Sequence, residues 1–194
     1  QEPYLLDLAI QTALKESKPE EIYNLAAQAF VQTSFRQPVL TADVNGLGVI
    51  RLLEATKEIR PDARIYQAST SELFGLVKES PQNENTPFHP RSPYGVSKAS
   101  GELYLMYYQA QYGLSFVSLR YANVYGPRQN PHGEAGVVAI FCQRLLRGDS
   151  CTIFGDGGQT RDFVFVSDVA RANLLAVQAA TSGVFNIGTG HETS

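Results

Sequence analysis

Tryptophan is absent from the 194 residues, methionine occurs once, and cysteine occurs only as Cys142 and Cys151. Two cysteines without a CxxC pair or a histidine cluster are too few for a disulfide framework or a typical zinc site. We therefore expect no bound metal. Low cysteine use of this kind also favours a reducing, cytoplasmic compartment.

Long apolar runs and an excess of basic residues are also missing. No run approaches the ~18 apolar residues that a membrane helix needs, so we expect no membrane partner. Lys and Arg total 16 against 19 Asp and Glu, which gives a net charge of −3 and no support for nucleic-acid binding. The chain opens without methionine or a signal segment and ends without an obvious boundary, which suggests a fragment of a longer protein.

What remains is a globular composition with alternating helical and extended patterns. Hydrophobic residues make up 43% and charged residues 18%. Helices are expected at 7–17, 39–59, 94–112, 135–146 and from Ser167 or Asp168 to 180. Strands are expected at 21–26, 64–68, 115–120, 151–154, 162–166 and 184–187. This alternation predicts an α/β fold with a largely parallel sheet and right-handed crossovers.

The segment YGVSK at 94–98 places Tyr94 and Lys98 four residues apart near the start of a predicted helix, and so on one face. A free tyrosine titrates near ~10, and a neighbouring ammonium lowers that pKa by favouring the phenolate. The pair could therefore act as a general base toward a hydroxyl group. The alternative is two exposed polar residues on a helix surface.

A second polar group, Ser69-Thr70-Ser71-Glu72, directly follows the predicted strand at 64–68. Active sites of open α/β sheets lie beyond the carboxyl ends of the strands, which favours a functional role. The alternative is helix capping, with a hydroxyl at the N-cap and Glu72 completing a capping box.

These two motifs, joined by a proline-rich loop at 79–93, together resemble the extended short-chain dehydrogenase/reductase family. Its members are NAD-dependent epimerases and dehydratases of nucleotide sugars. Further segments that match the family are 21–35, Asn45 with Gly48, 119–128, 155–166, 168–170 and 185–190. The resemblance implies a Rossmann-like, doubly wound parallel sheet that lacks its N-terminal part, with part of a small substrate-binding domain. It places a partial NAD-binding domain at 1–124 and substrate-binding segments at 125–194.

The resemblance also implies roles for single residues. Tyr94 would be the base at the sugar 4-hydroxyl, Lys98 would lower its pKa and hold the nicotinamide ribose, and Thr70 would hydrogen-bond the same sugar oxygen. Glu72 would take the C5 proton in a dehydration, and Ser71 stands where some dehydratases have an acidic Asp. Asn45 would support the site from the central helix. The residues expected to contact the cofactor are Leu25, Ala26, Ala27, Ser69, Tyr94, Lys98 and Tyr121, and those expected to contact the substrate are Asn123 and Arg161.

Three functions remain open. Glu72 and the run from 24 to 35 resemble the GDP-mannose 4,6-dehydratases, which indicates a nucleotide-sugar 4,6-dehydratase. The second half, from YGPRQ to GDGGQTRDFVFV, resembles the UDP-glucose 4-epimerases and supports an epimerase. A non-catalytic, truncated nucleotide-sugar-binding relative is the third possibility.

The expected cofactor is NAD, with NADP not excluded, although one cofactor element is missing. The family's glycine-rich turn between the first strand and first helix, which holds the pyrophosphate, has no counterpart near residue 1. We therefore expect this chain alone to bind NAD weakly or not at all. A nucleotide-diphosphate sugar and a second copy of the chain, in a homodimer through the helices at 39–59 and 94–112, are the expected partners.

Overall fold

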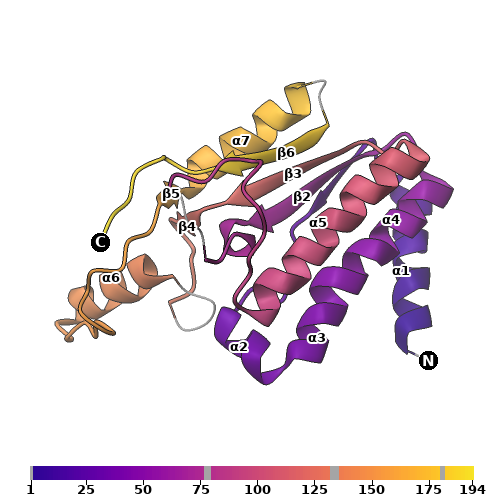
Figure 1. Cartoon of the computed structure of the whole chain (residues 1–194). Helices are drawn as coiled ribbons and strands as arrows, with labels where there is room; N and C mark the ends of the chain where they lie inside the picture. Colours follow the sequence, from indigo (N-terminus) through magenta and orange to yellow (C-terminus); the bar gives the residue numbers. More distant parts are fainter. Residues whose placement is uncertain (1, 77–79, 132–135, 180–181) are drawn as a thin grey trace. The chain divides into compact units, whose positions relative to one another are not determined.

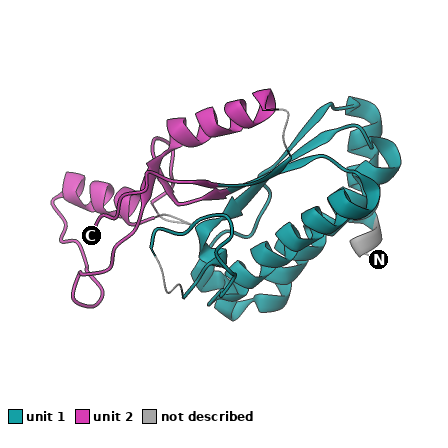
Figure 2. Ribbon diagram, turned by 45° about the horizontal axis from the view of Figure 1, so that its top comes forward, with its two compact units in different colours: residues 1–119, 181–185 teal, residues 120–180, 186–194 magenta. Residues whose placement is uncertain are grey.

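The computed structural model describes residues 2–76, 80–131, 136–179 and 182–194. It divides into two compact units, one of residues 1–119 with 181–185 and one of residues 120–180 with 186–194 (Figure 2). The first unit contains the YGVSK segment and the Ser69–Glu72 group, so its geometry decides whether they form one site.

The first unit is built from a sheet and the helices packed with it (Figure 1). Strands β1, β2, β3 and β6 are neighbours in that order, and β1 pairs with β2 in parallel, residue Glu21 opposite Arg64. The last residues of β3 and β6 continue into the second unit. The elements are α1 (Glu2–Ser17), β1 (Glu21–Asn24), α2 (Val31–Arg36), α3 (Pro38–Ala42), the π-helical turn η1 (Asp43–Leu47), α4 (Gly48–Ile59), β2 (Arg64–Thr70), the 3₁₀ turn η2 (Ser71–Leu73), α5 (Pro93–Tyr112), β3 (Phe116–Tyr121) and β6 (Gly183–Ile187).

Helix α5 has strong sequence signals at both ends. The Ser92 hydroxyl accepts a hydrogen bond from the Gly95 amide at 3.0 Å, and Pro93 occupies the first helical position, where its missing N–H costs nothing. Gly113 ends the helix with a left-handed φ of 74°. These caps place Tyr94 and Lys98 in the first two turns.

The core of the first unit lies between α4, α5 and the sheet. Its buried residues are Val49, Leu53, Ile65, Leu105, Tyr108, Leu114 and Phe116. A smaller cluster of Leu73, Phe74 and Ala99 joins the η2 turn to α5. Apolar burial on this scale contributes roughly 25 cal/mol per Å² and holds the helix carrying Tyr94 against the strand carrying Thr70.

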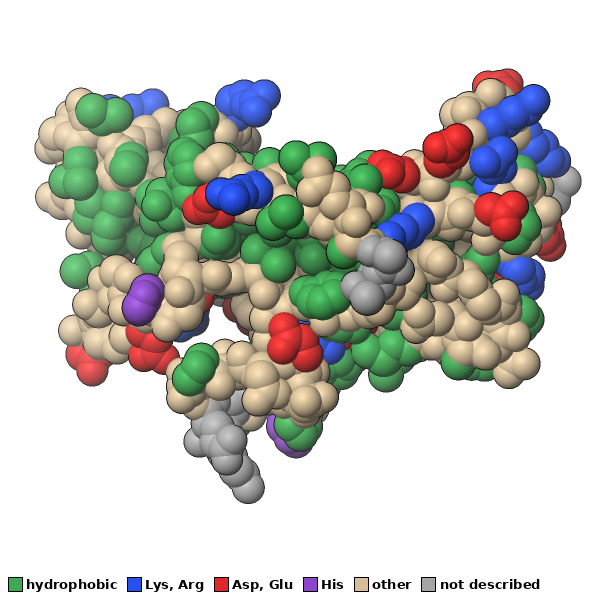
Figure 3. Space-filling view, turned by 90° about the horizontal axis from the view of Figure 1, so that it is seen from above, with side chains coloured by type: hydrophobic (Ala, Val, Ile, Leu, Met, Phe, Trp, Pro, Cys, Tyr) green, Lys and Arg blue, Asp and Glu red, His purple; other side chains and the backbone are tan. Residues whose placement is uncertain are grey.

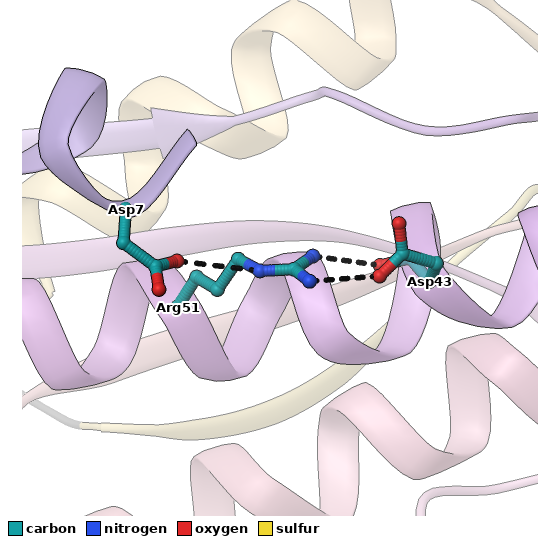
Figure 4. A network of polar contacts seen from close by, with 3 residues as sticks. All are labelled: Asp7, Asp43 and Arg51. Atoms are coloured by element: carbon teal, nitrogen blue, oxygen red, sulfur yellow. Dashed lines mark hydrogen bonds and ion pairs between the residues drawn. The ribbon is translucent and has the colours of Figure 1, made fainter. Parts of the chain in front are cut away.

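The predicted helix at 39–59 is one helical stretch interrupted by the π-turn η1. Arg51 bridges this turn and α1: its guanidinium lies 2.8 Å from Asp43 Oδ1 and 3.3 Å from Asp7 Oδ1 (Figure 4). Because Arg51 is mostly shielded from solvent, these pairs are screened less than surface ion pairs. They link α1, η1 and α4.

The second unit contains a short two-stranded parallel sheet and two helices. Its elements are β4 (Asn123–Tyr125), α6 (Val137–Arg147), β5 (Phe163–Phe165) and α7 (Val166–Gln178). Asn123 lies opposite Phe163 in the sheet. A groove of about 560 Å³ lies between the loop after β4 and α6.

Two sequence-based expectations about local structure are wrong, and one helix was not expected. Residues 151–154 form no strand, because they are exposed for the most part and have no strand partner among the described residues. Helix α7 begins at Val166 after Phe165, so neither Ser167 nor Asp168 is its N-cap. The sequence reading also missed α2, whose six residues are too few for a clear helical period.

The described helices include none that is both long and apolar enough to cross a membrane. Both cysteines are free, and Cys142 is exposed. His132 lies outside the described residues. On the face seen in Figure 3, acidic and basic side chains alternate among apolar and polar ones.

Gly75 holds the chain that follows the η2 turn in place, and it offers a test of this fold. Its φ is +56°, and a Cβ there would lie 1.8 Å from the His89 carbonyl oxygen. Gly75→Ala is expected to lower the free energy of unfolding by more than about 3 kcal/mol. The free-energy cost of backbone strain and the cost of the clash with the main chain both contribute to this loss. Gly113→Ala is the control, with φ +74° and open space, and should cost about 1 kcal/mol. Urea denaturation measures both, and equal losses would contradict this packing.

Candidate active site

The site is built on the carboxyl ends of β1 and β2. Asn24 and Gln67 lie opposite each other in the parallel register, and their side chains share a 2.8 Å hydrogen bond from Asn24 Nδ2 to Gln67 Oε1. Residues 25–27, which follow β1, and residues 68–72, which are the end of β2 and the start of η2, therefore lie at the same sheet edge. Ligands of open α/β sheets bind at this edge.

Leu25 and Ala26 follow the strand and are exposed, Leu25 by 68%, while Ala27 is half-buried. The expected strand at 21–26 is therefore two residues too long, because β1 stops at Asn24. The Ala26 amide donates to Asn24 Oδ1 at 3.3 Å, which turns the chain away from the strand direction. Exposed small and apolar groups at this edge leave a surface that a ligand can cover.

Tyr94 and Lys98 are both buried, at 9% and 7% exposure, so the alternative of two exposed surface residues is excluded. The Lys98 ammonium donates to the Ala68 carbonyl at 2.9 Å and lies 5.9 Å from the centre of the Tyr94 ring. Burial lowers the pKa of Lys98 from 10.5 to about 8 by penalising the charged form. The lysine thus carries its charge next to the tyrosine at neutral pH.

Thr70 serves as a helix cap at the end of β2. Its Oγ1 accepts a hydrogen bond from the Glu72 amide at 3.2 Å, which makes it the N-cap of η2. Capping uses an acceptor position of the hydroxyl and leaves its proton available to donate. The capping and functional interpretations of Thr70 are therefore compatible.

Gly95 sets the distance between η2 and α5. A Cβ at Gly95 would lie 2.9 Å from the Glu72 carbonyl oxygen, so only glycine allows this approach. The Glu72 side chain is exposed, and its carboxylate has no hydrogen-bond partner within the described ranges. Ser71 is half-buried beside it. The structure thus brings Thr70, Ser71 and Glu72 to the helix start that carries Tyr94.

Asn45 connects the loop after β1 to helix α5. Its amide oxygen accepts from the Gln28 amide at 2.8 Å, and its nitrogen donates to the Gln28 carbonyl at 3.0 Å and to Ser97 Oγ at 3.1 Å. Asn45 lies in the π-turn η1, a helical form that is frequent at functional sites. The loop after β1 is therefore tied directly to α5.

Ser69, Glu102 and Ser118 form a buried polar group that the sequence reading missed. The hydroxyls of Ser69 and Ser118 donate to Glu102 Oε2 at 2.9 and 2.8 Å. The expected contact of Ser69 with a cofactor stays a prediction, because its hydroxyl points into this group. The available signal was Glu102 itself, which stands one helical turn after Lys98 on the same face.

The remaining predicted residues, Tyr121, Asn123 and Arg161, belong to the second unit. Tyr121 exchanges hydrogen bonds with Asn173, and burial raises its pKa. Asn123 starts β4. Arg161 is exposed, its guanidinium donates to the Thr160 carbonyl at 2.7 Å, and no ion pair of the described residues includes it. Their roles stay predictions. No described cluster of three His, Cys, Asp or Glu side chains could hold a metal ion.

The family model described as GDP-mannose 4,6 dehydratase matches residues 5–194. The chain belongs to this family. The GDP-mannose 4,6-dehydratase of Vibrio cholerae is 37% identical over 184 residues, covering 93% of this chain and 50% of that protein.

Two solved structures of UDP-glucose 4-epimerases are more similar in sequence to this chain than the Vibrio cholerae dehydratase is. The Thermotoga maritima epimerase with UDP-glucose is 46% identical with a TM-score of 0.92, covering 96% of this chain and 61% of that one. The Thermus thermophilus epimerase complex with NAD is 44% identical with a TM-score of 0.89, covering 96% and 62%. The chain thus spans roughly half to three fifths of the length of these family relatives, and their Rossmann-like fold is its fold.

The buried charge of Lys98 predicts a characteristic pH dependence of stability. A lysine whose folded pKa lies below its unfolded value destabilises the fold while both states are protonated, and this penalty fades as pH rises from about 8 to 10.5. Lys98→Met removes the cost of the buried charge but also the hydrogen bond to Ala68. The net effect expected at pH 7 is a rise of about 1 kcal/mol in the free energy of unfolding.

The gain should shrink or change sign above pH 10. Urea denaturation at pH 7 and pH 10 measures it, with exposed Lys15→Met as the control that changes little at either pH. A gain of equal size at both pH values would contradict the buried, charged lysine.

Proposed function

We propose that this chain carries the catalytic part of an NAD-dependent enzyme that oxidises the 4-hydroxyl of a nucleotide-diphosphate sugar. The observation that carries the proposal is the buried Tyr94–Lys98 pair, which Lys98 ties to the Ala68 carbonyl near the carboxyl end of β2. The chain spans only part of its relatives, so the activity belongs to the protein in its full length.

The residues present fit the nicotinamide end of the cofactor. Lys98 provides a cation, and Leu25, Ala26 and Ala27 provide an exposed apolar surface at the same sheet edge. NAD is bound in the Thermus thermophilus relative, which supports it over NADP. When bound, the nicotinamide accepts a hydride from the sugar and later returns it. The sequence has no glycine-rich turn for the pyrophosphate, so these residues account for one end of the cofactor only.

The proposed chemistry of the protein groups begins with a proton. Tyr94, as phenolate, takes the proton of the sugar 4-hydroxyl, and the Lys98 charge lowers the cost of forming that phenolate. The Thr70 hydroxyl donates to the same sugar oxygen and orients it. This deprotonation, together with transfer of the C4 hydride to NAD, would give a 4-keto sugar, whose ketone acidifies the proton on C5.

Glu72 favours dehydration as the next step. Its exposed carboxylate lies two residues after Thr70 and can accept the C5 proton, after which the 6-hydroxyl leaves as water. Because a serine hydroxyl is a poor acid, Ser71 is a weak donor for this leaving group, and Glu72 would deliver the proton as well. This supports a 4,6-dehydratase as the first candidate.

A 4-epimerase is the second candidate, and the greater identity to the epimerase structures favours it. Epimerisation needs no base at C5, because the hydride returns to the opposite face of the ketone. Asn123 and Arg161 are proposed to contact the substrate in both cases, Arg161 through the planar, bidentate geometry that suits a diphosphate.

Product mass tests these candidates. Purified full-length protein is incubated with NAD and, separately, GDP-mannose and UDP-glucose, and the products are analysed by mass spectrometry. Loss of a water indicates the dehydratase, and an unchanged mass with a new sugar indicates the epimerase. Tyr94→Phe should lower turnover by about 100-fold or more in both cases while nucleotide-sugar binding stays within about twofold. Full activity of Tyr94→Phe would contradict the proposed base.

Glu72→Gln separates the candidates a second time. Under the dehydratase proposal, the variant still transfers hydride from C4 to NAD. The rate of formation of the dehydrated product falls by about 100-fold, because the C5 proton has no acceptor. Under the epimerase proposal, turnover changes by less than about threefold. Stopped-flow absorbance of reduced nicotinamide with one equivalent of substrate distinguishes C4 oxidation from the later steps.

We also propose that the full-length protein is a homodimer. Apolar side chains on α3, η1 and α5 are exposed, Val39 by 81%, and a groove of about 520 Å³ lies between α3, η1 and the start of α5. The exposed apolar residues on these helices include Val39, Leu40, Val44, Leu47, Val96 and Leu103. Soluble proteins rarely expose apolar groups this closely spaced unless a partner covers them.

Sedimentation velocity tests the dimer. Leu103→Glu should shift the protein to monomer by placing a charge in the contact. Leu8→Glu on α1, where the leucine is similarly exposed, should leave the sedimentation coefficient unchanged. A monomeric wild-type protein, or dissociation by both variants alike, would contradict the proposed face.

A further inference from the structure

Glu102 is a buried acid for which the proposed chemistry has no use. It is 1% exposed in the middle of α5, where an apolar side chain would avoid the cost of removing a carboxylate from water. Its Oε2 accepts hydrogen bonds from Ser69 Oγ at 2.9 Å and from Ser118 Oγ at 2.8 Å. Ser69 lies on β2 and Ser118 on β3, so one carboxylate oxygen connects α5 to two neighbouring strands.

The hydrogen bond of Glu102 to β2 lies next to another hydrogen bond between α5 and this strand. Lys98, one helical turn earlier on α5, donates to the carbonyl of Ala68, and Glu102 accepts from the next residue, Ser69. Two consecutive turns of the helix therefore hold two consecutive residues of the strand. Thr70, the following residue, caps η2.

We propose that Glu102 is a positioning residue: through Ser69 it fixes the end of β2 against α5, and so holds the Thr70 hydroxyl in register with Tyr94. The inference rests on the proposed function for the role of Thr70 and Tyr94. The sheet ladders hold the backbone of β2, and Lys98 and Glu102 add two contacts from α5 at its end. Glu102 supplies the second fixed point.

A carboxylate suits this task because hydrogen bonds to charged acceptors are shorter and stronger than neutral ones. They are also directional, whereas apolar contacts let a helix slide along a sheet. A shift of about 1 Å in a catalytic group can cost about 100-fold in rate, so a fixed strand end matters more to turnover than to stability.

Ser118 provides a matched control for Ser69. Both are buried serines that donate to the same oxygen at nearly the same distance, and removing either hydroxyl costs about 1 to 2 kcal/mol. Only Ser69 adjoins Thr70. If Glu102 acts by fixing the strand end, Ser69→Ala and Ser118→Ala will differ at the site although they are alike in stability.

The first experiment measures amide hydrogen exchange in the segment 68–74 of the 194-residue chain. Ser69→Ala is expected to raise exchange in this segment by about tenfold, and Ser118→Ala by less than about threefold, at matched free energies of unfolding. This readout requires no turnover, so it tests the inference even if the proposed function fails. Equal exchange in the two variants would overturn the inference.

The second experiment measures steady-state kinetics of the full-length protein with its preferred nucleotide sugar. Ser69→Ala and Glu102→Leu are expected to lower kcat by about 10- to 100-fold with KM within about twofold, whereas Ser118→Ala keeps kcat within about threefold. Glu102→Gln keeps an acceptor oxygen and should retain more kcat than Glu102→Leu.

Two kinetic results would overturn the inference. One is a common loss of kcat in Ser69→Ala and Ser118→Ala, which would indicate general destabilisation. The other is a weaker Kd for NAD in Ser69→Ala with kcat unchanged, which would show that Ser69 contacts the cofactor itself. An inactive wild-type protein would contradict the proposed function and leave the exchange experiment to decide on Glu102.

Discussion

The burial of the Lys98 ammonium between α5 and the end of β2 is the constraint on which the first unit depends. A charged amine in this position costs free energy, and the cost appears as the lowered pKa of Lys98. The fold tolerates it because the Ala68 carbonyl accepts a hydrogen bond from the ammonium and because the apolar cluster around Leu53, Leu105 and Phe116 supplies compensating burial. A strained, charged arrangement that stability alone would not favour is typical of functional sites.

Several polar groups surround this contact and share one purpose, which is to fix the distance between segments far apart in the sequence. Asn45 joins the loop after β1 to α5, Thr70 caps the turn after β2, and Gly95 lets that turn approach the helix. The Asp7–Arg51–Asp43 network holds the π-turn that carries Asn45. Each of these contacts is directional, so together they specify a geometry that apolar packing would leave adjustable.

Much of the fold followed from local patterns. The caps of α5 at Ser92, Pro93 and Gly113 are strong signals, and the apolar runs of β2 and β3 are typical of strands buried on both faces. The errors lie where local patterns are weak. Residues 151–154 alternate like a strand but have no strand partner within the described part of the chain, and the two turns of α2 are too short to show a helical period.

The sequence by itself determined that Tyr94 and Lys98 share a helix face, since four residues separate them, and that Thr70 and Glu72 follow a strand. It also carried the motifs of the family. Only the tertiary structure decided that Lys98 is buried with a lowered pKa, that Thr70 caps the turn after β2, and that Glu102 joins Ser69 to Ser118. The reason is physical. Spacing along a helix is local geometry, whereas burial and hydrogen bonds depend on residues far apart in the chain; the two serines that donate to Glu102 lie 16 and 33 residues from it.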